Sequence, residues 1–188
     1  MTYYSGKHLA DAFRTVRQNT IQTAQDIPED QFGFAPAEGT MNVATMLAHL
    51  AASTNFHVRL HGLDRKTELT FADFGGYMTQ AQQIQSALTT KAQIIDALTN
   101  RGEEFTHFLE TLTDEQLGEM VSLPAGMQPP AKSRFEMLLG AKEHEMHHRG
   151  QLMIMQRVMG ITPHLTRQRQ AAAALRSATP APAAVPAS

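Results

Sequence analysis

The sequence predicts an all-α protein: a four-helix bundle followed by a flexible C-terminal tail. Apolar residues recur three and four positions apart over long stretches, which is the period of an amphipathic helix. No stretch shows the alternation of a half-buried strand, and no Gly-rich phosphate loop occurs. A chain of 188 residues is long enough for one sizeable core and short for two domains. We therefore predict one bundle domain over residues 1–165 and an Ala/Pro-rich tail over residues 166–188.

The first two predicted helices lie on either side of a connector. Residues 5–25 follow the helical period and form the first helix. Residues 26–36 contain two prolines and a glycine, so they predict a connector. The second helix begins at Asn42, whose side chain suits an N-cap, and ends at Gly62.

The second half of the chain is expected to hold the other two helices. Residues 63–78 lack helical periodicity and predict a polar crossing over one end of the bundle. A third helix is predicted over residues 79–112, with an interruption near Gly102. The fourth helix opens at a capping box formed by Ser133 and Glu136 and runs to residue 159.

The tail changes composition after residue 166. Residues 167–178 can be helical because they are rich in alanine, which has the highest helix propensity. The last ten residues contain mainly alanine and proline and cannot bury enough apolar surface to become ordered.

Composition excludes several classes of protein. The net charge of −2 argues against a nucleic-acid-binding domain, which usually has a strongly basic face. The absence of cysteine excludes disulfides, iron–sulfur ligation and a cysteine nucleophile. No apolar run approaches the roughly 20 residues that span a bilayer, and the polar start does not suit a signal peptide. We therefore expect a cytoplasmic protein with no membrane and no nucleic-acid partner.

The strongest functional signal is the segment 143–151, which holds three of the nine histidines. His144 and His148 are four positions apart, so on a helix they lie one turn above each other and can bind one metal ion. Both belong to the apolar stripe of the fourth helix. Two buried imidazoles need partners for their ring nitrogens, either hydrogen-bonding groups or a metal ion. For an inward pair at this spacing, we favour the metal.

The same letters spell H-E-x-x-H, the pattern of zinc proteases in which the glutamate is the general base. Such proteases take a third ligand downstream, from an extended histidine motif or a later acidic residue. Here the extended positions hold Gln151 and Ile154, and no Asp or Glu follows Glu145. A zinc protease is therefore disfavoured. His49, among apolar residues of the second helix, is the expected third ligand.

Other polar residues near the motif have two interpretations each. Glu145 is a candidate catalytic base toward a bound water, or a solvated charge at the helix edge. Gln151 lies on the same face of the helix as the two histidines. It is a candidate for orienting a ligand or substrate, or a buried polar group bonded to a backbone carbonyl. His147 supports the site or lies in an interface. His57 and His61 form a second pair, expected to be partly exposed and without metal.

The two histidine segments together resemble the DinB/YfiT-like family. They read Met46-Leu-Ala-His-Leu-Ala51 and His144-Glu-Met-His-His-Arg-Gly-Gln-Leu152. The resemblance implies up-down-down-up connectivity, homodimers, and a divalent ion held by His49, His144 and His148. It also implies activities that use low-molecular-weight thiols, although many members have no established reaction.

Two functional hypotheses follow. The first is a metal-dependent enzyme, a thiol S-transferase or a hydrolase, which binds a small-molecule substrate and leaves one coordination position of its ion open. A low-molecular-weight thiol would be the co-substrate of the transferase. Zinc or nickel is expected, and histidine ligation also permits iron or copper. The second is a non-catalytic bundle braced by its ion, which acts as a stress-response interaction protein.

Overall fold

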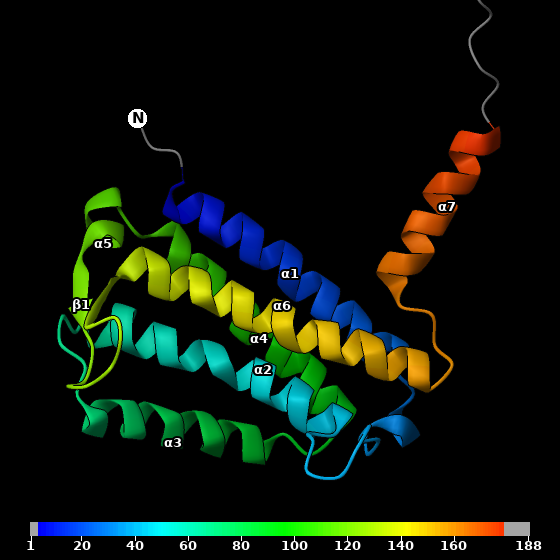
Figure 1. The fold of residues 1–188 in the computed structure, drawn as a ribbon, viewed down its shortest axis with the longest axis horizontal. Coiled ribbons are helices and arrows are strands. Elements are labelled where there is room, and N and C mark those ends of the chain that lie inside the picture. The colour runs from blue at the N-terminus through cyan, green and yellow to red at the C-terminus, as the bar shows by residue number, and fades with distance from the viewer. Residues whose placement is uncertain (1–3, 179–188) are drawn as a thin grey trace, which may run out of the picture.

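The computed structural model describes residues 4–178, which are mostly helical (Figure 1). Two short strands form the remaining regular structure of that part of the chain. The elements are α1 (Gly6–Asp26), the 3-10 turn η1 (Glu29–Gln31), α2 (Val43–His57), the π-helical turn η2 (Val58–Leu63), α3 (Phe71–Ala87), α4 (Lys91–Glu110), α5 (Asp114–Gly118), β1 (Met120–Ser122), β2 (Ala131–Ser133), α6 (Arg134–Val158) and α7 (His164–Ala178).

Four of the helices form the bundle. α1 packs against α4 and α6, and α2 packs against the same two helices. Followed along the chain in Figure 1, α1 and α6 run in one direction, and α2 and α4 run in the opposite one. The order of the four helices is therefore up-down-down-up, as predicted. α3 packs on α2 and connects the end of α2 to the start of α4 at the opposite end of the bundle. The all-α four-helix-bundle prediction is confirmed.

The prediction for residues 63–112 is wrong in its division of the helices. α3 begins inside the expected polar crossing, because Thr70 and Asp73 form a capping box. A second capping box, formed by Thr90 and Gln93, opens α4. The predicted single helix over residues 79–112 is thus two helices separated at residues 88–90. α4 continues through Gly102 without the expected interruption.

A smaller difference concerns two short strands, whereas the tail follows its helix propensity. β1 and β2 pair as an antiparallel hairpin, with Met120 opposite Ser133. Strands of three residues are too short to show an alternating pattern, so the sequence gives no sign of them. The helix that alanine propensity allows over residues 167–178 is present as α7, which extends away from the bundle (Figure 1). The last ten residues lie outside the described part of the chain.

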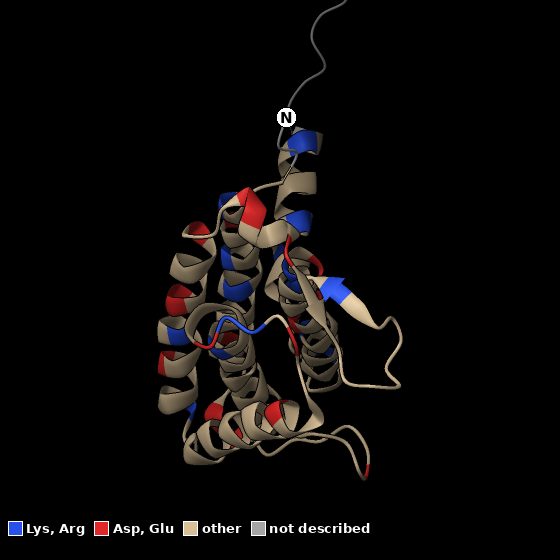
Figure 2. Cartoon of the chain, turned by 90° about the vertical axis from the view of Figure 1, so that its left-hand side faces the viewer, with Lys and Arg blue, Asp and Glu red and all other residues tan. Residues whose placement is uncertain are grey.

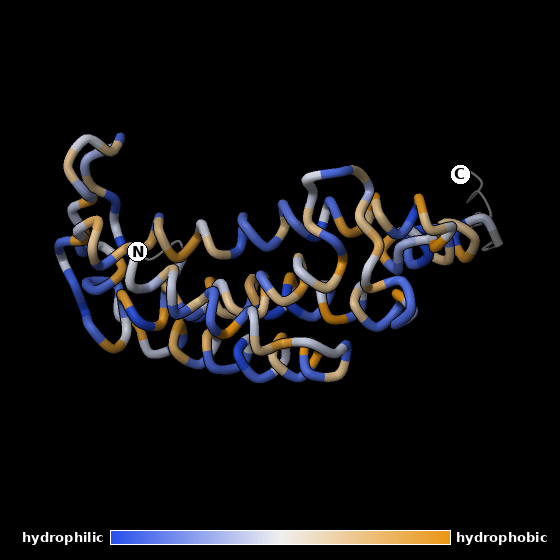
Figure 3. The backbone as a smooth tube through the Cα atoms, turned by 90° about the horizontal axis from the view of Figure 1, so that it is seen from below, coloured by the Kyte–Doolittle hydropathy of each residue, from blue (hydrophilic) through white to orange (hydrophobic). Residues whose placement is uncertain are grey.

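The buried apolar residues form two main clusters, one toward each end of the bundle. One cluster includes Phe32, Leu47 and Leu152, and the other includes Phe13 and Phe105. Hydrophobic and hydrophilic segments alternate along the helices, as amphipathic packing requires (Figure 3). Basic and acidic segments are interspersed in the view of Figure 2. Within residues 4–178, no helix combines the length and the apolar character that crossing a membrane demands.

A buried ion pair joins all four bundle helices between the two clusters. Arg17 on α1 donates through Nε and Nη2 to the carboxylate of Glu145 on α6, at 2.8–3.0 Å. It also donates to the carbonyl oxygens of Leu98 on α4 and Leu50 on α2, at 2.9 and 3.1 Å. Gly102 leaves room for the arginine, since a Cβ there would lie 2.8 Å from its Cγ. Arg17 and Glu145 are only 3% and 1% exposed.

We predict that Glu145→Gln lowers the free energy of unfolding by about 3–5 kcal/mol, because it leaves a buried arginine without its counter-ion. The double variant Arg17→Met/Glu145→Leu should recover most of that loss, since apolar residues of similar volume can replace a buried pair. Urea unfolding followed by circular dichroism measures these values.

Arg14→Met is the control. Arg14 pairs with Asp11 and Glu110 at the surface, so its loss should cost less than about 1 kcal/mol. If Glu145→Gln is as mild as Arg14→Met, the buried pair does not have the stabilising role assigned to it.

Candidate metal centre

Three histidines meet midway along the bundle. His49 comes from α2, and His144 and His148 come from successive turns of α6. One ring nitrogen of each lies within 4.8 Å of the other two. The Nε2 atoms of His49 and His144 are 2.9 Å apart. Within residues 4–178, no other three His, Cys, Asp or Glu side chains come together in this way.

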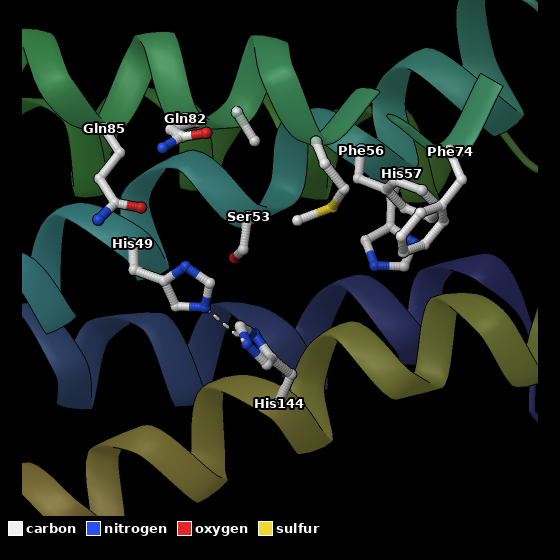
Figure 4. A pocket seen from close by; sticks show the side chains of 10 residues that line it. His49, Ser53, Phe56, His57, Phe74, Gln82, Gln85 and His144 are labelled. Carbon is white, nitrogen blue, oxygen red and sulfur yellow. Dashed lines mark hydrogen bonds between the residues drawn. The ribbon is translucent and has the colours of Figure 1, made fainter. Parts of the chain in front are cut away.

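Two glutamines lie beside the imidazole rings of this cluster. Gln151, one turn beyond His147 on α6, contacts His148 Nδ1 through Oε1 at 2.8 Å. Because the Oε1 atom only accepts, the proton of a neutral His148 is on Nδ1 and its Nε2 lone pair is free. Gln85 on α3 lies beside His49 (Figure 4) and raises the pKa of that imidazole, against the larger effect of burial. Such partners orient histidines that bind metals.

The local environment favours the neutral form of His49 and His144. Burial, together with the neighbouring His49, His148 and His147, lowers the pKa of His144 to about 4. Burial is also the main reason that the pKa of His49 lies below its ordinary value, with His148 adding to the effect. Histidine binds a metal only in its neutral form. His49 and His144 are therefore in the protonation state that metal binding requires at neutral pH.

The three residues fit a divalent transition-metal ion. Imidazole nitrogen is a good ligand for zinc, nickel, iron and copper. His49 and His144 already face each other with their Nε2 atoms, and the Nδ1 atom of His148 is taken by Gln151, so each ring can direct Nε2 to one point. The donor set is that of a three-histidine site with room for a further ligand.

The histidine cluster lies at one end of a cavity of about 390 Å³ between α2, α3 and α6. His49 and His144 line the cavity, and His148 is more deeply buried. Figure 4 shows the two lining histidines at one end, Ser53 next along α2, and Phe56 and Phe74 at the other end. A small molecule in this cavity would reach the face of the cluster opposite the buried His148.

The two candidate catalytic residues lie in different places. Gln151 contacts two histidines. Its Oε1 atom contacts His148, and its Nε2 atom lies 3.2 Å from Nε2 of His147. Glu145 points away from the cavity, and both of its carboxylate oxygens accept hydrogen bonds from Arg17. The structure therefore corrects both interpretations of Glu145: it is neither a solvated edge charge nor a base at the histidine cluster, but part of the bundle's buried ion pair.

The second histidine pair was expected to be partly exposed, which holds for His57 and is wrong for His61. His61 is 3% exposed, and its ring stacks on that of His57 at 5.9 Å. The π-helical turn that follows α2 holds His61 against Arg134, which donates from Nη1 to its Nδ1 at 3.0 Å. π-helical turns are frequent at functional sites, and His57 lines the cavity that holds the metal cluster.

Sequence reasoning missed three residues that shape this site: Gln85, His57 as a cavity residue, and Arg17 as the partner of Glu145. Gln85 lies on a helix whose start the sequence analysis did not find. The capping signal at Thr70 and Asp73 would have revealed that helix. No local signal connects Arg17 to Glu145, because they are 128 positions apart.

The chain was compared with known families, relatives and solved structures. Residues 12–152 match the model of the DinB superfamily, which is more than half of the chain. The chain belongs to this superfamily. Among curated proteins, YjoA of Bacillus subtilis, which is uncharacterised, is 27% identical over 150 residues, covering 80% of this chain and 88% of YjoA.

Two solved structures have similar folds, and one of them is of a DinB-like protein. The crystal structure of Bacillus subtilis YjoA matches with a TM-score of 0.62 at 25% identity, covering 82% of this chain and 93% of that one. The structure of YfiT from the same organism matches with a TM-score of 0.65 at 18% identity, covering 86% and 91%. YfiT is described as a probable metal-dependent hydrolase with an unusual four-helix bundle topology.

We predict that the metal-free protein loses stability as the pH falls below about 6.5. Burial lowers the pKa of His57 to about 4 and that of His61 to about 3. Between those values and 6.5 the unfolded chain binds more protons than the folded one, so the free energy of unfolding decreases with decreasing pH. Urea titrations from pH 7 to pH 4 measure this slope.

The variant His61→Gln keeps an acceptor for Arg134 and removes one titrating group. It should make the slope shallower. Unfolding free energies that are independent of pH over this interval would show that the two imidazoles are not held neutral by burial.

Proposed function

We propose that this DinB-superfamily protein is a metal-dependent enzyme acting on a small molecule, with a divalent ion held by His49, His144 and His148. The observation that carries the proposal is the convergence of three imidazoles at the end of an open cavity. Three protein ligands leave a coordination position for water or substrate, which is typical of catalytic sites. The description of YfiT as a probable metal-dependent hydrolase supports the same reaction class.

The proposed chemistry is hydrolysis, or transfer to a low-molecular-weight thiol. A divalent ion in such a site lowers the pKa of bound water or of a thiol, and so supplies a nucleophile at neutral pH. The chain has no cysteine to serve instead. We propose zinc or nickel as the ion; iron and copper also suit imidazole ligands.

The chain's own residues would prepare this site. Gln151 contacts Nδ1 of His148, and Gln85 lies beside the ring of His49 on α3. We assign Gln151 a positioning role, because its amide contacts two imidazoles of α6. Glu145 has no part in the proposed reaction.

The alternative is an ion that only braces the bundle. Two observations favour the enzyme. The ligands come from α2 and α6 alone, whereas the Arg17–Glu145 pair already joins all four helices. The cluster also borders a cavity, whereas structural metal sites are usually closed.

We predict that protein purified without a histidine tag binds about one zinc or nickel ion per chain. His148→Ala should weaken metal binding at least about 100-fold because it removes a ligand, and Gln151→Ala should weaken it about 10- to 100-fold. His107→Ala, at an exposed position of α4, is the matched control and should bind like the wild type. Metal analysis and competition with a chromophoric chelator give these values.

Turnover is then tested with ester, amide and thiol-conjugate substrates. It should disappear in folded His148→Ala and persist in His107→Ala. Failure to bind zinc, nickel, iron or copper contradicts the proposal outright. Retained metal without turnover, together with a large loss of thermal stability on chelation, would support the bracing role instead.

A further inference from the structure

The cavity beside the histidine cluster has a distinctive composition. Its lining comes from three helices and includes no Lys, Arg, Asp or Glu. Beyond the histidines, its polar groups are neutral: the hydroxyl of Ser53 and the amides of Gln82 and Gln85. A ligand charge placed in this cavity, away from the histidines, would lose its hydration without gaining an ionic partner, which is costly. The lining therefore selects against molecules that carry several charges.

The end of the cavity farthest from His49 and His144 holds two aromatic side chains together with His57. Phe56 on α2 and Phe74 on α3 meet edge to face, with ring centroids 5.7 Å apart. Figure 4 shows both rings beyond Ser53, on the side away from His49. Met78, one turn after Phe74, lines the same cavity. Phe74 and Met78 remain 40% and 41% exposed, so apolar surface is available to a bound group.

The position of α3 explains why this surface stays open. α3 packs on α2 and has only two buried residues, Tyr77 and Ala81. Its apolar side chains therefore form one wall of the cavity instead of filling a core. Along the cavity, His49 and His144 lie at one end with Gln82 and Gln85 beside His49, Ser53 follows, and Phe56, His57 and Phe74 lie at the other end (Figure 4).

From this order we infer the substrate class. The substrate is a small molecule with an aryl or alkyl arm, whose one polar group lies at the histidine cluster and whose arm lies against Phe56, Phe74 and Met78. The inference rests on the proposed function, since the histidine cluster is taken as the metal site. The uncharged lining disfavours nucleotides, phosphorylated sugars and multiply charged peptides.

Hydroxamates provide the test, because they chelate zinc and vary only in the attached arm. We expect zinc-loaded protein to bind benzohydroxamate or 3-phenylpropanohydroxamate at least about tenfold more tightly than acetohydroxamate. A carboxylate on the ring, as in 4-carboxybenzohydroxamate, should remove most of that preference. Isothermal titration calorimetry measures the affinities.

Variants of α3 test where the aryl or alkyl arm of the ligand binds. Phe74→Ala should reduce the preference for the aryl probes about tenfold without changing acetohydroxamate binding. Met78→Ala is a second variant with the same expectation. Phe71→Ala is the matched control: Phe71 is on the same helix, is 64% exposed and does not line the cavity.

The outcomes separate the two proposals. Acetohydroxamate binding with no aryl preference, or a preference unchanged by both cavity variants, overturns the substrate class and leaves the metal site standing. A preference lost equally in Phe71→Ala also overturns it. A protein that retains no zinc and no other divalent ion overturns the proposed function, and the substrate class with it.

Discussion

The buried pair of Arg17 and Glu145 is the constraint on which the rest of the structure depends. It lies between the two apolar clusters, and its arginine contacts every helix of the bundle. Neither partner can turn toward solvent without leaving a charge buried, so the pair fixes the rotation of α6 about its axis. Successive helical residues differ by about 100°. With Glu145 facing the interior beside α1, His144 is directed to the side of α2, where His49 lies.

The second constraint is the crossing helix. The up-down-down-up order places α2 and α4 parallel, so the chain must return along the bundle between them. It does so as α3, an outer helix that packs on α2 and forms one wall of the cavity. The same helix supplies Gln85 to His49 and apolar side chains to the far end. The connection required by the topology thus also builds half of the candidate site.

The parts of the fold that were predictable depend on local signals. The helices over residues 5–25, 42–62 and 133–159 were predicted closely because periodicity and caps lie within each segment. The structure brings together His49, His144 and His148, which helical spacing and the inward stripe had identified. The first half of α3 was missed because its exposed Phe71 and Phe74 do not follow an amphipathic pattern. The role of Glu145 was missed because its partner, Arg17, is distant in sequence.

The central claim is that one divalent ion is bound by three imidazoles and retains an open coordination position. X-ray absorption at the metal edge of the loaded, untagged protein tests this directly, because multiple scattering from imidazole rings reports their number. The account predicts three imidazoles together with one or two oxygen ligands that exchange when acetohydroxamate is added. A first shell with one imidazole or none, or a shell of protein ligands that is unchanged by acetohydroxamate, would contradict it.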